Sequence, residues 1–331
     1  MEIIIEKRQA YTSYSKNLEK KGIGTKKSGR VELNPIEVLY LALKNNVKVR
    51  IRNRVANVVD LFNWAVSSDE DCLYYYYVYE DLRSRGYKVK PVDRFLVGKY
   101  VFLPIAESKK VTIKEIAEQN VEQLILAVVD EENEVTYYKV EEVDLRGNQI
   151  EHIEKIKGYL IKDKVITTNT ELFNKFFYGS CKDGIVTLSI IEALYLMELG
   201  VLDVYERNKK LNKDDLRKIG LKLDPNFDRR YEVYKDLKDR GFVVKTGFKF
   251  GSDFRVYDIV RDVNDLPHSK YLVTIVDDKR LYMYEIARAV RLAQSVKKKM
   301  IFVYKNNGEN KYILIERIKV WFIFNFTTKN L

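Results

Sequence analysis

The strongest constraint on this chain is that part of its sequence occurs twice. The segment 36–41 (IEVLYL) recurs at 191–196 (IEALYL), and 79–86 (YEDLRSRG) recurs at 234–241 (YKDLKDRG), both at an offset of 155 residues. A repeat of this length indicates one supersecondary pattern that folds twice. We therefore predict a tandem duplication, with a first repeat over 1–150 and a second over 151–331.

Beyond these segments the offset between the copies changes. The segment 121–129 aligns with 296–304, and Tyr137 aligns with Tyr312, now at an offset of 175 residues. The first copy therefore lacks 20 residues that the second copy has in the interval between the aligned segments. This interval of the second copy is where the repeats differ most.

The apolar pattern predicts a mixed α/β (α+β) fold in each repeat. A helix is expected to begin at Asn34-Pro35, because proline suits a first helical turn, and another to end at Gly86. Each repeat should combine an N-terminal subdomain of helices and strands with a C-terminal strand-helix-strand subdomain of nuclease-like type. In the second repeat these subdomains are predicted at about 165–242 and about 243–331.

The C-terminal subdomain of the second repeat has the clearest pattern. Its expected elements are strands within 245–257, a strand at 270–276, an amphipathic helix at 284–297, and two strands at 300–304 and 311–318. The last two strands should form a hairpin around Asn306-Asn307-Gly308. If the helix continues that far, Arg291 and Lys298, two turns apart, would share one of its faces.

Composition limits the classes of partner and compartment. The net charge of +11 favours a polyanionic partner, and 331 residues with 46% hydrophobic content suffice for two cores. Cys72 and Cys181 are too few for a disulfide framework or a zinc cluster. No signal peptide or membrane span is evident, so a cytoplasmic protein is expected, with no membrane partner.

Three side chains of the second repeat match the needs of RNA cleavage without a metal ion. Such cleavage needs a base for the 2'-hydroxyl group, an acid for the leaving 5'-oxygen, and a cation that stabilises the charged phosphorane. Tyr257, His268 and Lys298 could fill these roles, with no cofactor and no metal. The only other histidine, His152, is predicted at the surface of a helix.

Longer motifs around these residues resemble a known family. The segments 247–257 (GFKFGSDFRVY), 267–269 (PHS) and 291–298 (RLAQSVKK) resemble the catalytic domain of archaeal tRNA-splicing endonucleases, of the two-repeat homodimeric type. Family members usually read Ser-Val-Arg-Lys where this chain has lysine at position 297. The resemblance implies cleavage of precursor tRNA at bulge-helix-bulge intron-exon junctions, leaving 2',3'-cyclic phosphate and 5'-hydroxyl ends. It implies Tyr257 as general base, His268 as general acid and Lys298 as the transition-state stabiliser.

The resemblance also implies residues that bind substrate and join two subunits. In the family two arginines hold a flipped-out bulge base, a role that would fall to Arg291 and Arg317. An acidic loop of the family docks on a facing subunit, and its counterpart is the stretch 130–134 of the first repeat. A homodimer is therefore expected, with docking through four acidic residues, Asp130, Glu131, Glu132 and Glu134.

The first repeat lacks the candidate reactive residues. At the offset of 175 residues, Lys298 aligns with Gln123, and the clamp positions align with Ile116 and Glu142. The first repeat is therefore predicted to be a non-catalytic structural partner. Two alternatives remain open at this point: a structure-specific RNA-binding protein without catalysis, and a metal-dependent DNA nuclease, which would need a cluster of carboxylates.

Overall fold

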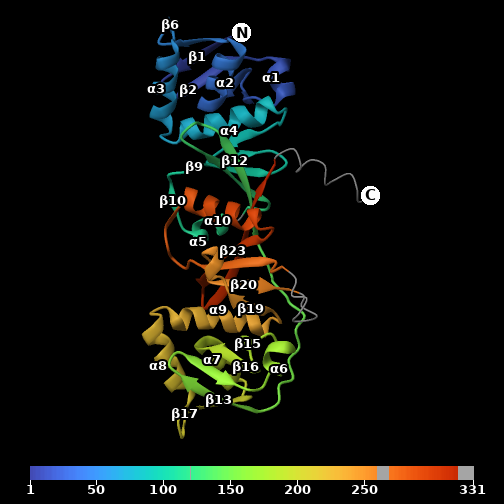
Figure 1. Ribbon diagram of the computed structural model, residues 1–331. Coiled ribbons are helices and arrows are strands. Elements are labelled where there is room, and N and C mark those ends of the chain that lie inside the picture. The colour runs from blue at the N-terminus through green and yellow to red at the C-terminus, as the bar shows by residue number, and fades with distance from the viewer. Residues whose placement is uncertain (120, 259–267, 320–331) are drawn as a thin grey trace, which may run out of the picture. The chain divides into compact units, whose positions relative to one another are not determined.

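The computed structural model describes residues 1–119, 121–258 and 268–319, which fall into two compact units (Figure 1). Unit 1 comprises Met1–Glu141, Asp278–Arg291 and Leu314–Leu331, and unit 2 comprises Glu142–Asp277 and Leu292–Ile313. The fold is mixed α/β, as predicted. No helix within the described ranges is long and apolar enough to cross a membrane.

Unit 1 begins with a six-stranded sheet. Its strands lie in the order β3-β4-β2-β1-β5-β6, and β1 and β5 are parallel while the other neighbours are antiparallel. Alternation along β1 buries Ile3 and Ile5 on one face of the sheet. The strands are β1 (Glu2–Glu6), β2 (Gln9–Ser13), β3 (Thr25–Lys27), β4 (Arg30–Leu33), β5 (Lys48–Ile51) and β6 (Arg54–Val55).

Four helices accompany this sheet. They are α1 (Lys16–Lys21), α2 (Pro35–Asn45), α3 (Val58–Ser68) and α4 (Cys72–Ser84). Helix α2 begins at Pro35 as predicted, because the Asn34 side chain accepts from the Ile36 amide and the Glu37 carboxylate accepts from the Asn34 amide. Gly86 follows α4 with a φ of 87°, in the left-handed region that glycine adopts without strain.

A second sheet completes unit 1. Its strands lie in the order β12-β11-β9-β8-β7, and β9 and β11 are parallel. The chain between these two passes through β10 (Lys110–Val111), which pairs with β22 (Leu281–Tyr282), and through α5 (Ile113–Ala117). The strands are β7 (Lys90–Val92), β8 (Phe95–Val97), β9 (Val101–Ala106), β11 (Leu124–Val129) and β12 (Val135–Glu142).

Unit 2 begins with a six-stranded sheet of the same topology. Its order is β15-β16-β14-β13-β17-β18, again with one parallel pair, β13 and β17. The strands are β13 (Ile156–Ile161), β14 (Lys164–Thr167), β15 (Ser180–Lys182), β16 (Ile185–Ser189), β17 (Leu202–Glu206) and β18 (Lys209–Lys210). The helices are α6 (Glu171–Asn174), α7 (Ile190–Glu198), α8 (Lys213–Leu223) and α9 (Phe227–Asp239).

The second sheet of unit 2 carries the candidate catalytic residues. Its order is β19-β20-β21-β23-β24, with β19, β20 and β21 successively antiparallel and β21 parallel to β23. The elements are β19 (Val243–Thr246), the short 3-10 helix η1 (Phe248–Phe250), β20 (Phe254–Tyr257), β21 (Tyr271–Ile275), β23 (Lys299–Asn306) and β24 (Glu309–Ile318). Between β21 and β23 the chain forms α10 (Met283–Ser295), and most of this helix, like the end of β24, belongs to unit 1. Asn307 and Gly308 join the last two strands with φ values of 49° and 87°, which confirms the predicted hairpin turn.

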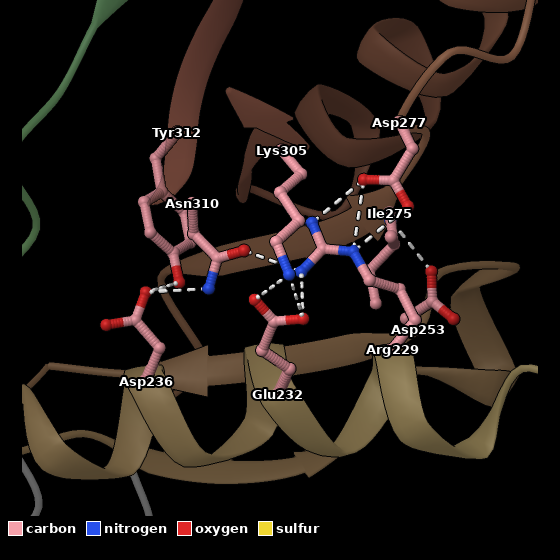
Figure 2. Close-up of polar contacts among 9 residues, drawn as sticks. All are labelled: Arg229, Glu232, Asp236, Asp253, Ile275, Asp277, Lys305, Asn310 and Tyr312. Atoms are coloured by element: carbon pink, nitrogen blue, oxygen red, sulfur yellow. Dashed lines mark hydrogen bonds and ion pairs between the residues drawn. The ribbon is translucent and has the colours of Figure 1, made fainter. Parts of the chain in front are cut away.

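A polar network attaches α9 to this sheet (Figure 2). The Arg229 guanidinium binds both carboxylate oxygens of Asp277 at 2.8 to 3.1 Å and the Asn310 side chain at 2.6 Å. One turn farther along, Lys305 forms an ion pair with Glu232 at 2.9 Å. Since these partners come from several loops and strands of unit 2, the network fixes α9 against the sheet.

The same hydrogen bonds occur in both units at the offsets found in the sequence. The Tyr137 hydroxyl donates to Asp81 at 2.6 Å, and Tyr312 donates to Asp236 at 2.6 Å (Figure 2). Likewise Glu37 accepts from the Gly24 amide at 2.8 Å, as Glu192 does from the Gly179 amide at 2.8 Å. These repeated contacts support the interpretation of the chain as a tandem duplication.

Two local predictions were wrong. Helix α10 ends at Ser295, two residues before the expected end, and Lys297 has a left-handed φ of 57°. Lys298 therefore lies in the turn before β23, and it does not share a helix face with Arg291. His152 is exposed as expected, but residues 151–155 form no helix.

Candidate active site

Tyr257, His268 and Lys298 lie at one edge of the second sheet of unit 2. Tyr257 is the last residue of β20, and His268 comes shortly before β21, which runs antiparallel to β20. Lys298 directly precedes β23, which runs parallel to β21. Strand β21 lies between β20 and β23, so the end of β20 and the beginnings of β21 and β23 meet at the same edge, and the topology brings all three residues together.

Backbone hydrogen bonds fix this edge. The Lys270 amide donates to the carbonyl oxygen of Val256 at 2.9 Å, which joins the start of β21 to the residue before Tyr257. The Lys299 amide donates to the carbonyl oxygen of Lys270 at 2.9 Å, which joins the start of β23 to the same point. The candidate residues are thus held by rigid strand ends.

The Tyr257 ring is almost completely buried. Only 6% of the residue is exposed, and the ring packs with Phe177 and Val243 in a small apolar cluster. The guanidinium group of Arg255 lies 6.0 Å from the centre of the ring. Arg255 and Tyr257 are two residues apart on a strand, so their side chains point to the same side of the sheet.

Lys298 is also buried, with 9% exposure. Its Nζ atom donates a hydrogen bond to the carbonyl oxygen of Ser269 at 3.2 Å and lies 5.4 Å from the centre of the Phe250 ring. Burial lowers the pKa of the Lys298 ammonium group, and the positive charge of Arg255 lowers it further. Lys298 therefore holds its proton less tightly than an ordinary lysine.

His268 differs from the other two because its side chain is exposed. Its neighbour Ser269 is buried and provides the carbonyl oxygen that binds Lys298. The hydrogen bond from Lys298 thus fixes the backbone next to His268, while the imidazole remains accessible from solvent. Pro267, the preceding residue of the motif, lies outside the described residues.

A cavity of about 650 Å³ opens beside this edge of the sheet. Its wall includes Tyr257, Arg255 and Lys245 from the sheet, and Glu192 and Arg230 from α7 and α9. The volume is in the range of small-molecule sites. Among residues 1–119, 121–258 and 268–319, no three His, Cys, Asp or Glu side chains form a group that could hold a metal ion.

Comparison with known proteins connects this site to a family. A family model described as "tRNA intron endonuclease, catalytic C-terminal domain" matches residues 227–313, and one described as "tRNA intron endonuclease, N-terminal domain" matches residues 156–217. The chain is 33% identical to the tRNA-splicing endonuclease of Methanococcoides burtonii over 96% of this chain and 97% of that protein. The chain belongs to the tRNA-splicing endonuclease family.

Further archaeal relatives extend the match over nearly the whole length. The tRNA-splicing endonuclease of Methanosarcina mazei is 33% identical over 90% of this chain and 92% of that protein. The tRNA-splicing endonuclease of Haloarcula marismortui is 30% identical over 94% of this chain and 96% of that protein. These matches confirm the predicted family and the prediction of an RNA-cleaving enzyme of the endonuclease type.

Within this member of the tRNA-splicing endonuclease family, the two predicted clamp arginines lie in unit 1. Arg291 is exposed on α10 and Arg317 is exposed on β24. Burial raises the pKa of the Tyr138 hydroxyl group, and the charges of Arg291 and Arg317 both counteract this shift. Both arginine charges thus act on the Tyr138 hydroxyl group.

The acidic stretch of the first repeat forms the hairpin between β11 and β12. Its turn is closed by the Asp130 carboxylate, which accepts from the amides of Glu132 and Glu134 at 3.0 and 2.9 Å. The side chains of Glu131, Glu132 and Glu134 are exposed, and the Glu131 amide donates to Glu107 at 3.3 Å. In the described part of the chain, none of these hairpin carboxylates forms an ion pair with a lysine or arginine.

Arg255 and Lys245 are parts of the site that were not predicted from the sequence. Arg255 precedes Tyr257 by two residues within the segment that resembles the family, so strand alternation could have placed the two side chains together. Lys245 lies opposite Arg255 in the pairing of β19 with β20, and this register is not evident from the sequence alone. Both basic side chains border the cavity beside the candidate general base.

Proposed function

We propose that unit 2 cleaves precursor tRNA at bulge-helix-bulge elements by a transesterification that uses Tyr257, His268 and Lys298. The observation that carries this proposal is the position of the three residues at adjoining strand ends, together with membership in the tRNA-splicing endonuclease family. A buried tyrosine that borders the cavity, with an exposed histidine and a buried lysine at the adjoining strand ends, suits a base, an acid and a charge stabiliser.

In the proposed reaction the 2'-oxygen forms a bond to phosphorus while the bond from phosphorus to the 5'-oxygen breaks. Tyr257, in its phenolate form, takes the proton of the 2'-hydroxyl group. His268, in its imidazolium form, gives a proton to the leaving 5'-oxygen, and Lys298 stabilises the negative charge of the phosphorane. The products carry a 2',3'-cyclic phosphate and a 5'-hydroxyl group, and the balanced reaction uses neither ATP nor water.

Recognition is proposed to depend on RNA shape and on unstacked bulge nucleotides. Arg291 and Arg317 are proposed to hold one bulge base between their guanidinium planes, which stack well on a splayed nucleotide. A bulge is also what allows a nucleotide to leave the helix and enter the cavity beside Tyr257.

The active form is proposed to be a homodimer of two-repeat chains. The exposed carboxylates of the β11–β12 hairpin are proposed to dock on a basic surface of the second chain. Opposite charges across such an interface favour one orientation of the partner. A symmetric dimer would present two cleavage sites to a substrate with two bulges.

The test is cleavage of an end-labelled bulge-helix-bulge RNA in excess chelator, with analysis of the product ends. Wild-type protein should cleave both bulges and leave cyclic phosphate ends, and His268→Ala should reduce the rate by about 10² to 10⁴-fold, as expected for loss of a general acid. His152→Ala is the matched control, because His152 is an exposed histidine outside the site. Tight binding without any cleavage would instead support a structure-specific RNA-binding protein.

A further inference from the structure

Two neighbouring strands of unit 2 present basic side chains to the cavity. In the register of β19 with β20, Lys245 lies opposite Arg255 and Val243 lies opposite Tyr257. Since side chains on a strand alternate between faces, Lys245, Arg255 and Tyr257 all project to the same side of the sheet. All three border the cavity of about 650 Å³.

The other cations of this cavity have carboxylate partners. Lys245 lies 3.8 Å from the Glu192 carboxylate and donates to the carbonyl oxygen of Gly179 at 2.8 Å. Arg230 forms ion pairs with Asp224 at 2.8 Å and with Asp253 at 3.3 Å. Their positive charges are therefore balanced within the protein.

Arg255 has no such compensation in the described part of the chain. It forms no ion pair there, and its Nε atom is buried without a hydrogen-bond acceptor. A buried donor that lacks an acceptor costs free energy, because it has given up its contacts with water. Its guanidinium lies over the ring of Tyr257, 6.0 Å from the ring centre. Such a group is ready to bind an anion.

Further positive charge gathers around Arg255. Its charge lowers the pKa of Lys298, after the larger effect of burial, and it lowers the pKa of the buried Lys245 in the same way. Like charges repel, so holding them together costs stability unless a negative group joins them. The cost is typical of a functional site rather than of a packed core.

Unit 1 provides an internal comparison. Its strands β7 and β8 place Lys90 opposite Val97, where unit 2 places Lys245 opposite Arg255. Lys90 and Lys245 are separated by the repeat offset of 155 residues. The unit that lacks the candidate catalytic residues thus retains the lysine and has valine instead of the arginine. An arginine at this position is therefore not required for the two strands to pair.

We propose that Arg255 binds the phosphate that is cleaved, donating N–H groups of its guanidinium to the non-bridging oxygens beside Tyr257 and Lys298. A planar guanidinium can donate two parallel hydrogen bonds to a phosphate, whereas an ammonium group acts as a single charge. The scissile phosphate supplies the negative charge that Arg255 lacks in the free protein. This inference rests on the proposed function, because it assumes an RNA phosphate at the site.

The test compares Arg255→Gln and Arg255→Lys with wild type and with the control Arg217→Gln. Arg217 is a cation of the same unit that forms an exposed ion pair with Asp228 at 2.6 Å. Single-turnover cleavage gives the rate at the bound substrate. Binding of an RNA with 2'-deoxyribose at both cleavage positions, measured against salt concentration, gives the number of phosphate contacts. Thermal unfolding confirms that each variant is folded.

Arg255→Gln should lose about 10²-fold or more in cleavage rate, as expected when one charged donor to a transition-state oxyanion is removed. It should also reduce the slope of log affinity against log salt by about 0.7 for a single-stranded phosphate contact. Arg255→Lys should retain the salt slope but cleave more slowly than wild type, since it keeps the charge and loses the paired donors. Arg217→Gln should cleave as wild type.

The inference is overturned if folded Arg255→Gln both cleaves within about threefold of the wild-type rate and keeps the wild-type salt slope. About a threefold change in rate is too small for the loss of a contact to the transition state. A rate loss that Arg255→Lys fully restores would also overturn it, because paired donors would then be unnecessary. If wild-type protein binds the RNA and cleaves none, the proposed function fails. The salt slopes of the variants still decide in that case whether Arg255 contacts a phosphate.

Discussion

The Nζ atom of Lys298 donates a hydrogen bond to the carbonyl oxygen of Ser269, at 3.2 Å. Through this bond a buried cation just before β23 fixes the backbone next to His268, shortly before β21. The proposed charge stabiliser therefore also positions the proposed acid. Substitution of Lys298 should therefore slow cleavage more than substitution of an ordinary surface lysine.

Replacing Lys298 by glutamine should lower the single-turnover cleavage rate by about 10² to 10³-fold, the range for loss of one oxyanion-stabilising group. The neighbouring Lys297 is the matched control, since it is exposed and adopts a left-handed φ of 57° that glutamine tolerates equally well. Lys297→Gln should cleave at nearly the wild-type rate. Equal losses in the two variants would mean that general positive charge, and not the buried position, is what matters.

Local sequence signals predicted those parts of the fold that a few neighbouring residues determine. Asn34 and Pro35 mark a helix start because a side-chain cap and a fixed φ act within one turn, and Asn307-Gly308 marks a hairpin because both residues accept positive φ. The end of α10 was predicted too late, since the apolar periodicity continued through Val296 although the backbone turns at Lys297.

The contacts that complete the candidate site depend on strand register and tertiary pairing. Arg255 stands out because it forms no ion pair in the described residues, whereas Arg230 pairs with Asp224 and Asp253. This difference can be seen only once the positions of the carboxylates are known. The bond from Lys298 to Ser269 joins residues 29 positions apart and has no local signal. The candidate catalytic residues themselves were found from their spacing and the family resemblance, and their roles remain predictions.

The repeated tyrosine–aspartate bonds should contribute equally to stability. Tyr137→Phe and Tyr312→Phe each remove one buried hydrogen bond of 2.6 Å, to Asp81 and Asp236 respectively. Each should lower the free energy of unfolding by about 1 to 2 kcal/mol, because the carboxylate then loses one charge-assisted partner and retains its arginine. Denaturant unfolding measures this effect.

Tyr159→Phe is the control for these substitutions, since Tyr159 is 49% exposed. It should change the free energy of unfolding by less than about 0.5 kcal/mol, as is usual at a surface position. A clear loss in one of the two buried variants and none in the other would show that the two bonds are not equivalent in energy, against the duplication hypothesis.

The exposed carboxylates of the β11–β12 hairpin should determine the oligomeric state. Changing Glu131, Glu132 and Glu134 together to lysine should convert the proposed dimer into monomers, because three attractive contacts become repulsive. Asp130 is left unchanged, since its carboxylate closes the turn through the amides of Glu132 and Glu134. Analytical ultracentrifugation at several salt concentrations measures the change.

The control for this experiment is Glu70→Lys, a reversal of one exposed charge elsewhere in unit 1. It should leave the dimer intact. Wild-type dimers should also weaken at high salt, since exposed charges are screened beyond about 10 Å at 0.1 M salt. A triple variant that remains dimeric at micromolar concentration would exclude the hairpin as the docking element.

The lowered pKa of Lys298 should appear in the pH dependence of cleavage. Because burial and Arg255 both favour the neutral amine, Lys298 loses its proton below the ordinary lysine value of 10.5, and the rate should fall as the pH rises through this lowered pKa. The folded protein binds this proton less tightly than the unfolded chain, so the contribution of Lys298 to the free energy of unfolding rises as the pH rises. The titration of Lys298 therefore does not unfold the protein at high pH, and the fall in rate has another cause, the loss of the positive charge. Lys298→Arg, which stays charged throughout, should lose the alkaline fall, and Arg255→Gln should move it to higher pH. An alkaline fall that is the same in wild type and Lys298→Arg would assign it to another group.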